Sequence, residues 1–216
     1  MLLSTAYFPP VSWFAAVAKD LTLSPDRVIP SKPVLEACEN YQKQSYRNRC
    51  RIYTSNGVES LSVPVVHEGG TFRLPITEIK VEYTTPWIQR TERAIDSAYL
   101  TSAYFEYYRD DIFSILESRP ETLWELDLKL IEYLLDKTGV AAEIGFTDSY
   151  LPFPAGEDDY REIIHPKKLN TILKDLQLEK PYFQVFAGKY GFVLDLSVID
   201  LLFNEGPDSI LYLKRL

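Results

Sequence analysis

The chain has 216 residues and a net charge of −8, and 46% of its residues are hydrophobic. This length suits a single domain, which we place at residues 1–216, and the hydrophobic content excludes an intrinsically disordered chain. The acidic balance argues against a nucleic-acid-binding protein, and no stretch reaches the roughly 18 apolar residues of a membrane span.

Cysteine content and the start of the chain indicate a cytoplasmic protein. The first residues, MLLSTAYFPP, lack the basic region and the apolar core of a signal peptide. Thiols stay reduced in the cytoplasm, so we expect Cys38 and Cys50 to be free. A disulfide between them is the less favoured alternative.

Strand signals dominate the first part of the chain. In chain order, the predicted elements are a strand at residues 2–8, a helix at 11–20, a Pro-rich loop at 24–33, a strand at 34–40, a hairpin at 50–66 and a strand at 76–83. An Asn-Gly pair in the middle of the hairpin is the strongest short turn signal. Alternation in the hairpin predicts one face with Cys50 and Ile52, and an opposite face with Arg49, Arg51 and Tyr53.

Helical periodicity dominates the second part of the chain. The predicted elements are a helix that starts at Pro86 and includes Tyr99, a helix at 122–139, a strand at 141–146, a helical segment at 166–176 and a helix from Ser197 to Gly206. In the helix at 122–139, Thr122 and Glu125 form a capping box and Gly139 ends the helix. Strands interleaved with helices predict an α/β fold, with a mixed sheet that contains an antiparallel hairpin and with flanking helices.

The segment NYQKQSYRNRCRI, residues 40–52, is basic within an acidic protein. We predict that it forms an anion site from the side chains of Asn40, Lys43, Arg47, Asn48 and Arg49. Guanidinium groups hold carboxylate or phosphate with two hydrogen bonds, a lysine adds a mobile charge, and the amides orient the ligand or brace the loop. Two alternatives stay open: the solvated edge of a hairpin, or counterions for carboxylates elsewhere in the fold.

Two residues outside the basic segment carry reactive groups. Cys38 precedes the basic segment, whose cations would favour its thiolate, although a free cysteine is commonly a small core residue. His165 is a candidate general acid or base, with an exposed loop before Pro166 as the alternative. His67 lies in a turn-like context and is a weaker candidate.

The segment LSVIDLLFNEGP near the end of the chain combines helix signals with two polar residues. Asp200 and Asn204 lie four residues apart and share one helix face, so they would form a polar pocket wall, with Asp200 as a catalytic candidate. Alternatively, Asp200 pairs with an arginine of the basic segment.

Motifs for cofactors and metals are not found. The sequence lacks GxGxxG, GxxxxGK[ST], HExxH and CxxC, so no cofactor and no metal site is predicted. The acidic run at 157–159 is expected to be a solvated loop.

Five blocks of sequence resemble the WbqC-like protein family, particularly its shorter, Bacteroides-type members. In chain order they are LSTAYFPPVSWF, ENYQKQSYRNRCRI, LSVPV, AIDSAYLTSAYFEYY and LSVIDLLFNEGP. They run from about residue 2 to residue 207, and together they are specific although each alone is not. Two positions depart from the family pattern. Relatives often have a histidine at the position of Cys38, and many have one close to the position of Thr91.

The resemblance implies a role in the biosynthesis of O-antigen or other surface polysaccharides. It implies transfer of an acyl or aminoacyl group to an amino sugar or sugar nucleotide, with Tyr7 and Tyr99 as pocket walls. The expected partner is a small anionic substrate, such as a sugar nucleotide or an acyl donor. The alternative is a non-catalytic protein that docks a sugar nucleotide or a partner enzyme, and homo-oligomer formation is left open.

Overall fold

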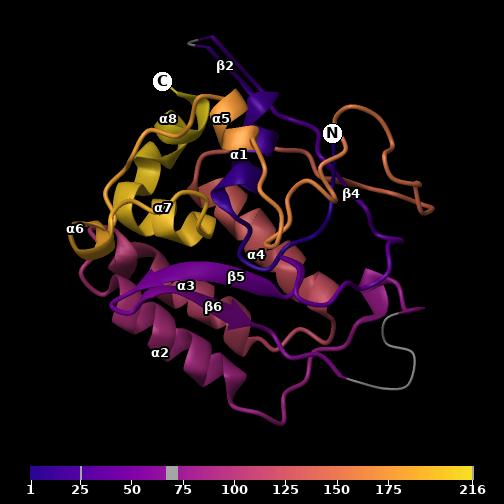
Figure 1. Cartoon of the computed structure of the whole chain (residues 1–216). Helices are drawn as coiled ribbons and strands as arrows, with labels where there is room; N and C mark the ends of the chain where they lie inside the picture. The colour runs from indigo at the N-terminus through magenta and orange to yellow at the C-terminus, as the bar shows by residue number, and fades with distance from the viewer. Residues whose placement is uncertain (25, 67–72, 216) are drawn as a thin grey trace.

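Three short parallel strands bring together residues that are far apart in the sequence. The computed structural model describes residues 1–24, 26–66 and 73–215 (Figure 1). A parallel sheet is formed, in this order, by β1 (Leu2–Leu3), β4 (Val34–Leu35) and β7 (Gly145–Phe146). Leu3 and Leu35 are fully buried, whereas Phe146 is 49% exposed, so the sheet is buried at β1 and β4 and reaches the surface at its edge strand β7.

Helices occur along the whole chain and are most frequent after residue 86. They are α1 (Val11–Lys19), α2 (Trp87–Tyr99), α3 (Phe105–Glu117), α4 (Leu123–Lys137), α5 (Ile172–Asp175), α6 (Ala187–Tyr190), α7 (Val198–Glu205) and α8 (Ser209–Lys214), with 3-10 turns η2 (Ile76–Glu78) and η3 (Gly206–Asp208). Helices together with small parallel and antiparallel sheets confirm the predicted α/β class. No helix among the described residues is long and apolar enough to cross a membrane.

Two antiparallel hairpins accompany the parallel sheet. β5 (Arg49–Thr54) pairs with β6 (Gly57–Ser62), and β2 (Thr22–Ser24) pairs with β3 (Arg27–Ile29). The first hairpin crosses the middle of the molecule in Figure 1, with α2 on one side and α7 on the other. Cys50 and Ile52 are fully buried on one face, as predicted. Tyr53 on the other face is also buried, because α6 covers it and its hydroxyl donates to the Gly191 carbonyl at 2.8 Å.

Helices α1 and α7 lie at the centre of the core. Every residue from Val11 to Ala18 is buried, and so is every residue from Val198 to Asn204. α7 contacts α1, α3, α4 and α8. The buried apolar side chains form a cluster that extends from Leu3 to Leu213. The single-domain organisation stays a prediction.

The predicted strand at 76–83 is wrong. Residues Ile76–Glu78 form η2, and Lys80 and Val81 make isolated bridges only. The buried residues Ile76 and Ile79 are three positions apart, which suits one turn of helix and not the alternation of a strand.

Several other boundaries also differ from the predictions. The strand at 2–8 ends after Leu3, and Phe8 has a φ of +43°, which an extended strand does not allow. The strand at 34–40 is reduced to β4, the predicted loop at 24–33 contains β3, and the helical segment at 166–176 is reduced to α5. Both cysteines are free, as predicted.

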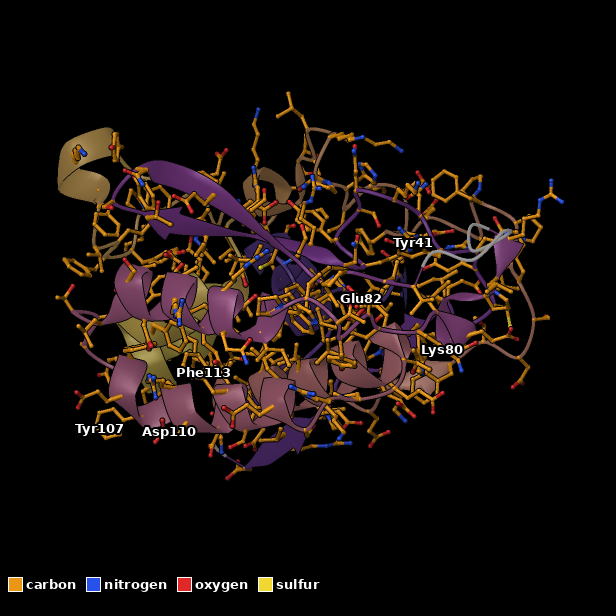
Figure 2. The ribbon with its side chains drawn as sticks, turned by 90° about the horizontal axis from the view of Figure 1, so that it is seen from below. Tyr41, Lys80, Glu82, Tyr107, Asp110 and Phe113 are labelled. Atoms are coloured by element: carbon orange, nitrogen blue, oxygen red, sulfur yellow. The ribbon has the colours of Figure 1, made fainter. Side chains whose placement is uncertain are left out.

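Helix α3 was not predicted, because its polar residues obscure a narrow apolar face. Phe105, Ile112 and Leu116 are fully buried. Figure 2 shows Tyr107 and Asp110 on the outer side of this helix, and Phe113 on its inner side. The buried positions recur at steps of three, four and seven residues, as expected for one helix face.

Helix α4 has the capping box that the sequence predicts. The Thr122 hydroxyl accepts a hydrogen bond from the Glu125 backbone N–H, and the Glu125 carboxylate accepts one from the Thr122 N–H, both at 3.2 Å. We expect Thr122→Ala to lower the free energy of unfolding by about 1 kcal/mol, because it leaves an N-terminal N–H without its acceptor. Urea denaturation measures this loss. Glu121→Ala, which removes only an exposed side chain, should change the value by less than about 0.5 kcal/mol, and an equal loss in both variants would contradict the capping role.

Candidate functional site

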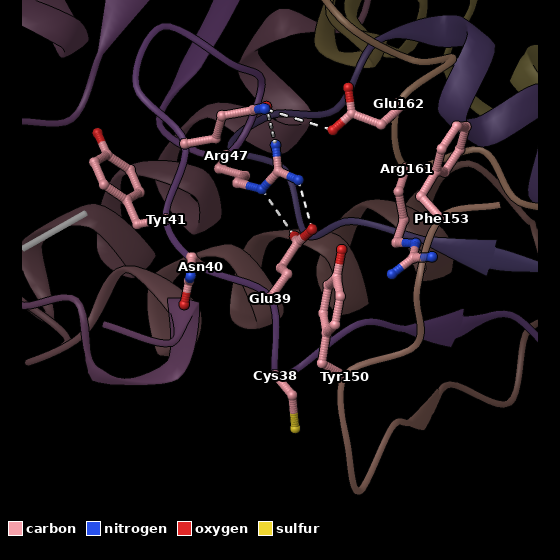
Figure 3. Close-up of a pocket in the computed structure, with 10 residues that line it drawn as sticks. Cys38, Glu39, Asn40, Tyr41, Arg47, Tyr150, Phe153, Arg161 and Glu162 are labelled. Carbon is pink, nitrogen blue, oxygen red and sulfur yellow. Dashed lines mark hydrogen bonds and ion pairs between the residues drawn. The ribbon is translucent and has the colours of Figure 1, made fainter. Parts of the chain in front are cut away.

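A cleft of about 470 Å³ opens where the parallel strands end (Figure 3). Its lining residues are Cys38, Glu39, Asn40, Tyr41, Gln42, Arg47, Tyr150, Phe153, Arg161 and Glu162. One wall follows β4 and the other follows β7, and these strands pair in parallel. The carboxyl ends of parallel strands therefore meet at one edge of the sheet, which is where ligands bind in open α/β sheets.

Arg47 faces inward and forms a buried ion pair with Glu39. Its Nε and Nη2 atoms donate to the Glu39 carboxylate at 2.8 and 2.5 Å, its Nη1 donates to Gln42 Oε1 at 3.0 Å, and its Nη2 donates to Ser4 Oγ at 2.7 Å. Glu39 immediately precedes the basic segment. Arg47 is therefore a counterion for a carboxylate, one of the two alternatives that the sequence left open.

Arg161 lies at the centre of a second buried ion-pair group. Its side chain donates to Glu36 Oε2 at 2.9 Å, to both oxygens of Asp159 at 2.9 and 2.6 Å, and to the Leu151 carbonyl at 2.6 Å. Burial alone would raise the pKa of Asp159, but the hydrogen bonds from Arg161 and from the Ala155 N–H lower it below its usual value. The expectation of a solvated loop at 157–159 is therefore wrong for Asp159, which is buried.

Glu162 lies at the rim of the cleft. Its Oε2 accepts a hydrogen bond from Lys168 Nζ at 2.7 Å, and its Oε1 faces Gln42 Nε2 at 3.5 Å. Partial burial would raise the pKa of Glu162, but Lys168 lowers it below its usual value, so the group is ionised at neutral pH.

His165 follows in the same loop and does not line the cleft. Burial, with a contribution from the nearby Lys168, lowers its pKa, so the ring is neutral at pH 7. Its Nδ1 accepts a hydrogen bond from the Lys167 N–H at 3.2 Å, which places the ring proton on Nε2. His165 lies in a loop, as in the alternative that the sequence left open, but its side chain is half-buried and not exposed. His67 lies outside the described residues.

A shallow hollow of about 250 Å³ adjoins the cleft, and Tyr41 lines both. Lys43, Asn48 and Arg49 line this hollow, and among its described lining residues there is no carboxylate. Arg49 Nε donates to the Ser62 hydroxyl at 3.2 Å, and Asn48 Nδ2 donates to the Val63 carbonyl at 3.0 Å. The structure thus brings three of the five predicted anion-binding residues together, and places Arg47 and Asn40 in the neighbouring cleft.

Cys38 lines the cleft and contacts residues that follow β4 and β7. Its N–H donates to Glu36 Oε1 at 3.0 Å, and its Sγ lies 3.8 Å from the Thr147 carbonyl oxygen. Among the described residues, no group of three or more His, Cys, Asp and Glu side chains is arranged to hold a metal ion.

Tyr7 and Tyr99 lie in the core and line neither the cleft nor the hollow. They are 0% and 1% exposed. The Tyr7 ring packs against Phe8 and the Tyr99 ring against Phe203, with centroids 4.6 and 5.1 Å apart. Burial raises the pKa of both hydroxyl groups, so both rings are neutral core side chains.

Asp200 and Asn204 also lie in the core, away from the cleft. Asp200 Oδ2 accepts hydrogen bonds from the Tyr182 hydroxyl at 2.6 Å and from Gln184 Nε2 at 3.0 Å. Asn204 Nδ2 donates to the backbone carbonyl of Asp200 at 2.7 Å. The alternative of an ion pair between Asp200 and an arginine of the basic segment is not realised: Arg47 pairs with Glu39, Arg49 donates to the Ser62 hydroxyl, and Arg51 donates to the Asp195 carbonyl.

The buried carboxyl group of Asp200 should make stability depend on pH. Burial raises its pKa from 3.8 to about 6. At this group the folded protein binds a proton more tightly than the unfolded chain. The contribution of Asp200 to stability is therefore highest below about pH 4, falls as the pH rises to about 6 and is then constant. We expect Asp200→Asn to remove this part of the pH dependence, up to roughly 3 kcal/mol, in urea denaturation at a series of pH values. Asp148→Asn, at an exposed site, should retain the slope, and an unchanged slope in Asp200→Asn would contradict the assignment.

The residues missed by sequence reasoning are mainly Glu36, Glu39, Arg161 and Glu162. A usable signal existed for two of them: Glu36 and Glu39 interrupt an otherwise apolar predicted strand, and buried carboxylates require partners.

The cleft lies in the part of the chain that is similar to known proteins. Residues 7–164 match the model of the WbqC-like protein family. An uncharacterized protein of Mycobacterium tuberculosis, Rv1507c, is 26% identical over 198 residues, which cover 81% of this chain and 84% of the relative. No solved structure matches the chain. The whole lining of the cleft lies inside the matched range, whereas α7 with Asp200 lies outside it.

Proposed function

The chain belongs to the WbqC-like protein family, and on this premise we propose that it binds a sugar nucleotide during the biosynthesis of a surface polysaccharide. In this proposal it works in the cytoplasm and transfers a small acyl or aminoacyl group to an amino sugar. The observation that carries the proposal is the pairing of a polar cleft with an adjoining hollow that contains two cations.

The cleft has the composition that a sugar requires. Its volume of about 470 Å³ lies within the roughly 300–1,000 Å³ of small-molecule sites. Asn40 and Gln42 line the cleft with amide groups that can donate to and accept from hydroxyl groups, while Glu39 remains in its buried pair with Arg47. Tyr150 and Phe153 are 54% and 45% exposed, and their rings offer apolar faces to a sugar ring. A sugar can therefore form hydrogen bonds with the polar side chains and pack its ring against the two aromatic rings.

The adjoining hollow suits the diphosphate of the same ligand. Arg49 offers a planar guanidinium and Lys43 a mobile ammonium group, the two groups that hold phosphate oxygens in many proteins. Tyr41 lines both spaces, so one ligand can extend from one to the other. The anion site is thus proposed with two cations, because Arg47 is occupied by Glu39.

Acyl transfer in such a site needs no protein nucleophile if the donor is activated. A protonated amino group first loses its extra proton to solvent. The neutral amine then forms the new C–N bond, the leaving group departs with its electron pair, and the nitrogen loses a second proton to solvent. The protein contributes by orienting the amine and by stabilising the developing oxyanion.

A non-catalytic binding protein is the second candidate. It is favoured by one observation: of the three predicted catalytic residues, Cys38 lines the cleft, but His165 and Asp200 do not. The resemblance described above also leads us to expect a histidine where Cys38 stands.

Titration with uridine diphosphate sugars tests the proposal. We expect Lys43→Gln and Arg49→Gln each to weaken binding about tenfold, since each removes a charge-assisted contact to phosphate. Lys80→Gln, which removes an exposed cation paired with Glu121, should bind like the unaltered protein. Absence of binding by the unaltered protein would overturn the proposal. Binding without product, in a screen of activated acyl donors, would select the non-catalytic candidate.

A further inference from the structure

The charges behind the cleft favour a cationic group in the ligand. Arg161 contacts two buried carboxylates, Glu36 and Asp159, so this group of one cation and two anions has a formal charge of −1. The neighbouring pair of Arg47 and Glu39 is balanced. An anion that entered the cleft would therefore meet guanidinium groups whose charge is already compensated, whereas a cation would be attracted.

Glu162 is the carboxylate best placed to receive that cation. Its side chain is 31% exposed at the rim. Its Oε1 accepts a hydrogen bond from Gln42 Nε2 at 3.5 Å, a long and therefore weak bond. This oxygen can accept a further hydrogen bond from a stronger donor. Figure 3 shows the Glu162 carboxylate directed toward the side of the cleft where Arg47 lies.

Gln42 helps to orient the Glu162 carboxylate, together with Lys168. Arg47 Nη1 donates to Gln42 Oε1 at 3.0 Å, which turns the amide NH₂ group of Gln42 toward Glu162. The buried pair of Arg47 and Glu39 thereby positions a carboxylate that lies outside that pair. Gln42 is a positioning residue, because it acts through Glu162.

Lys168 shows that a cation already binds to Glu162. Its ammonium group lies 2.7 Å from Oε2, and its side chain is 50% exposed. Exposed pairs of this kind contribute roughly 0–1 kcal/mol, so the lysine can move aside at little cost when a ligand amine arrives.

We propose that Glu162 binds the protonated amino group of an amino-sugar ligand and so selects amino sugars over sugars with a hydroxyl group at the same position. This inference rests on the proposed function, since it places a sugar in the cleft. Glu162 is then the residue that recognises the amine, and the group that enters the cleft is a cation and not an anion. The anionic part of the ligand is held in the hollow beside Arg49.

Titration calorimetry with two probes, UDP-glucosamine and UDP-glucose, tests this inference. We expect the unaltered protein to bind the amino sugar about tenfold more tightly, as one charge-assisted hydrogen bond provides. Glu162→Gln should abolish this preference and change the affinity for UDP-glucose by less than twofold. Gln42→Ala should reduce the preference, and Lys168→Gln should keep or increase it. At alkaline pH, where the ligand amine loses its proton, the preference of the unaltered protein should also disappear.

The possible failures are distinguishable. If the unaltered protein binds both probes equally, Glu162 does not recognise an amine, and the sugar-nucleotide proposal stands without it. If it binds neither probe, both proposals are overturned. If folded Glu162→Gln, checked by circular dichroism, loses affinity for both probes to the same extent, the residue binds a shared part of the ligand and the inference is wrong.

Discussion

Arg161→Met is expected to lower the free energy of unfolding by about 3–5 kcal/mol, because it leaves Glu36 and Asp159 buried without their shared cation. Both carboxylates are almost inaccessible to water, so solvent cannot replace the guanidinium. Urea denaturation at pH 7 measures the loss.

A matched variant distinguishes the effect of burial on stability from the effect of removing an arginine. Arg109 also contacts two carboxylates, Asp96 and Asp110, but all three side chains are substantially exposed. Arg109→Met should therefore cost less than about 1 kcal/mol. In the Arg161→Met background, Glu36→Gln with Asp159→Asn should restore part of the stability, since the unpaired charges are then gone. Equal losses in the two methionine variants would show that burial of the Arg161 group is unimportant.

Gly206→Ala is expected to destabilise the protein by about 2–5 kcal/mol, for two reasons that add. Gly206 ends α7 with φ +55° and ψ −128°, a conformation that is strained for residues with a side chain. A Cβ atom there would also lie 2.5 Å from two ring atoms of Tyr104. Thermal and urea denaturation should both report the loss.

Two further variants divide this effect into its parts. Gly188→Ala places a methyl group in open space in α6, so it should be close to neutral. Tyr104→Ala combined with Gly206→Ala removes the clash and keeps the backbone strain, so the double variant should be more stable than the sum of the single changes predicts. A neutral Gly206→Ala would mean that the chain relaxes around the added carbon.

Local signals explain why some elements could be predicted. The capping box at Thr122, the Asn-Gly turn and the end of α7 at Gly206 depend on residues that are close in the sequence, and all three are present. η2 was predicted as a strand because two isoleucines three positions apart are consistent with more than one local structure.

The candidate site could be predicted only in part, because its contacts join distant segments. Arg161 and Glu36 are 125 positions apart, and their contact depends on the pairing of β4 with β7. Sequence reasoning identified cations in the segment at 40–52, but it could not show that Arg47 points inward while Arg49 points to the hollow. Tyr7 and Tyr99 were associated with the site by resemblance, and Asp200 by its spacing to Asn204 on one helix face, but in the fold all three are core residues.

The shortness of the parallel strands affects how such a protein can diverge. Each strand of the β1-β4-β7 sheet has two residues, and the cleft is lined by the loops that leave the carboxyl ends of β4 and β7, not by the strands themselves. Two buried arginines join these loops to one another. Substitutions at exposed loop positions such as Tyr150 or Phe153 can therefore change the ligand while the ion pairs preserve the shape of the cleft, so recognition and folding can evolve almost independently.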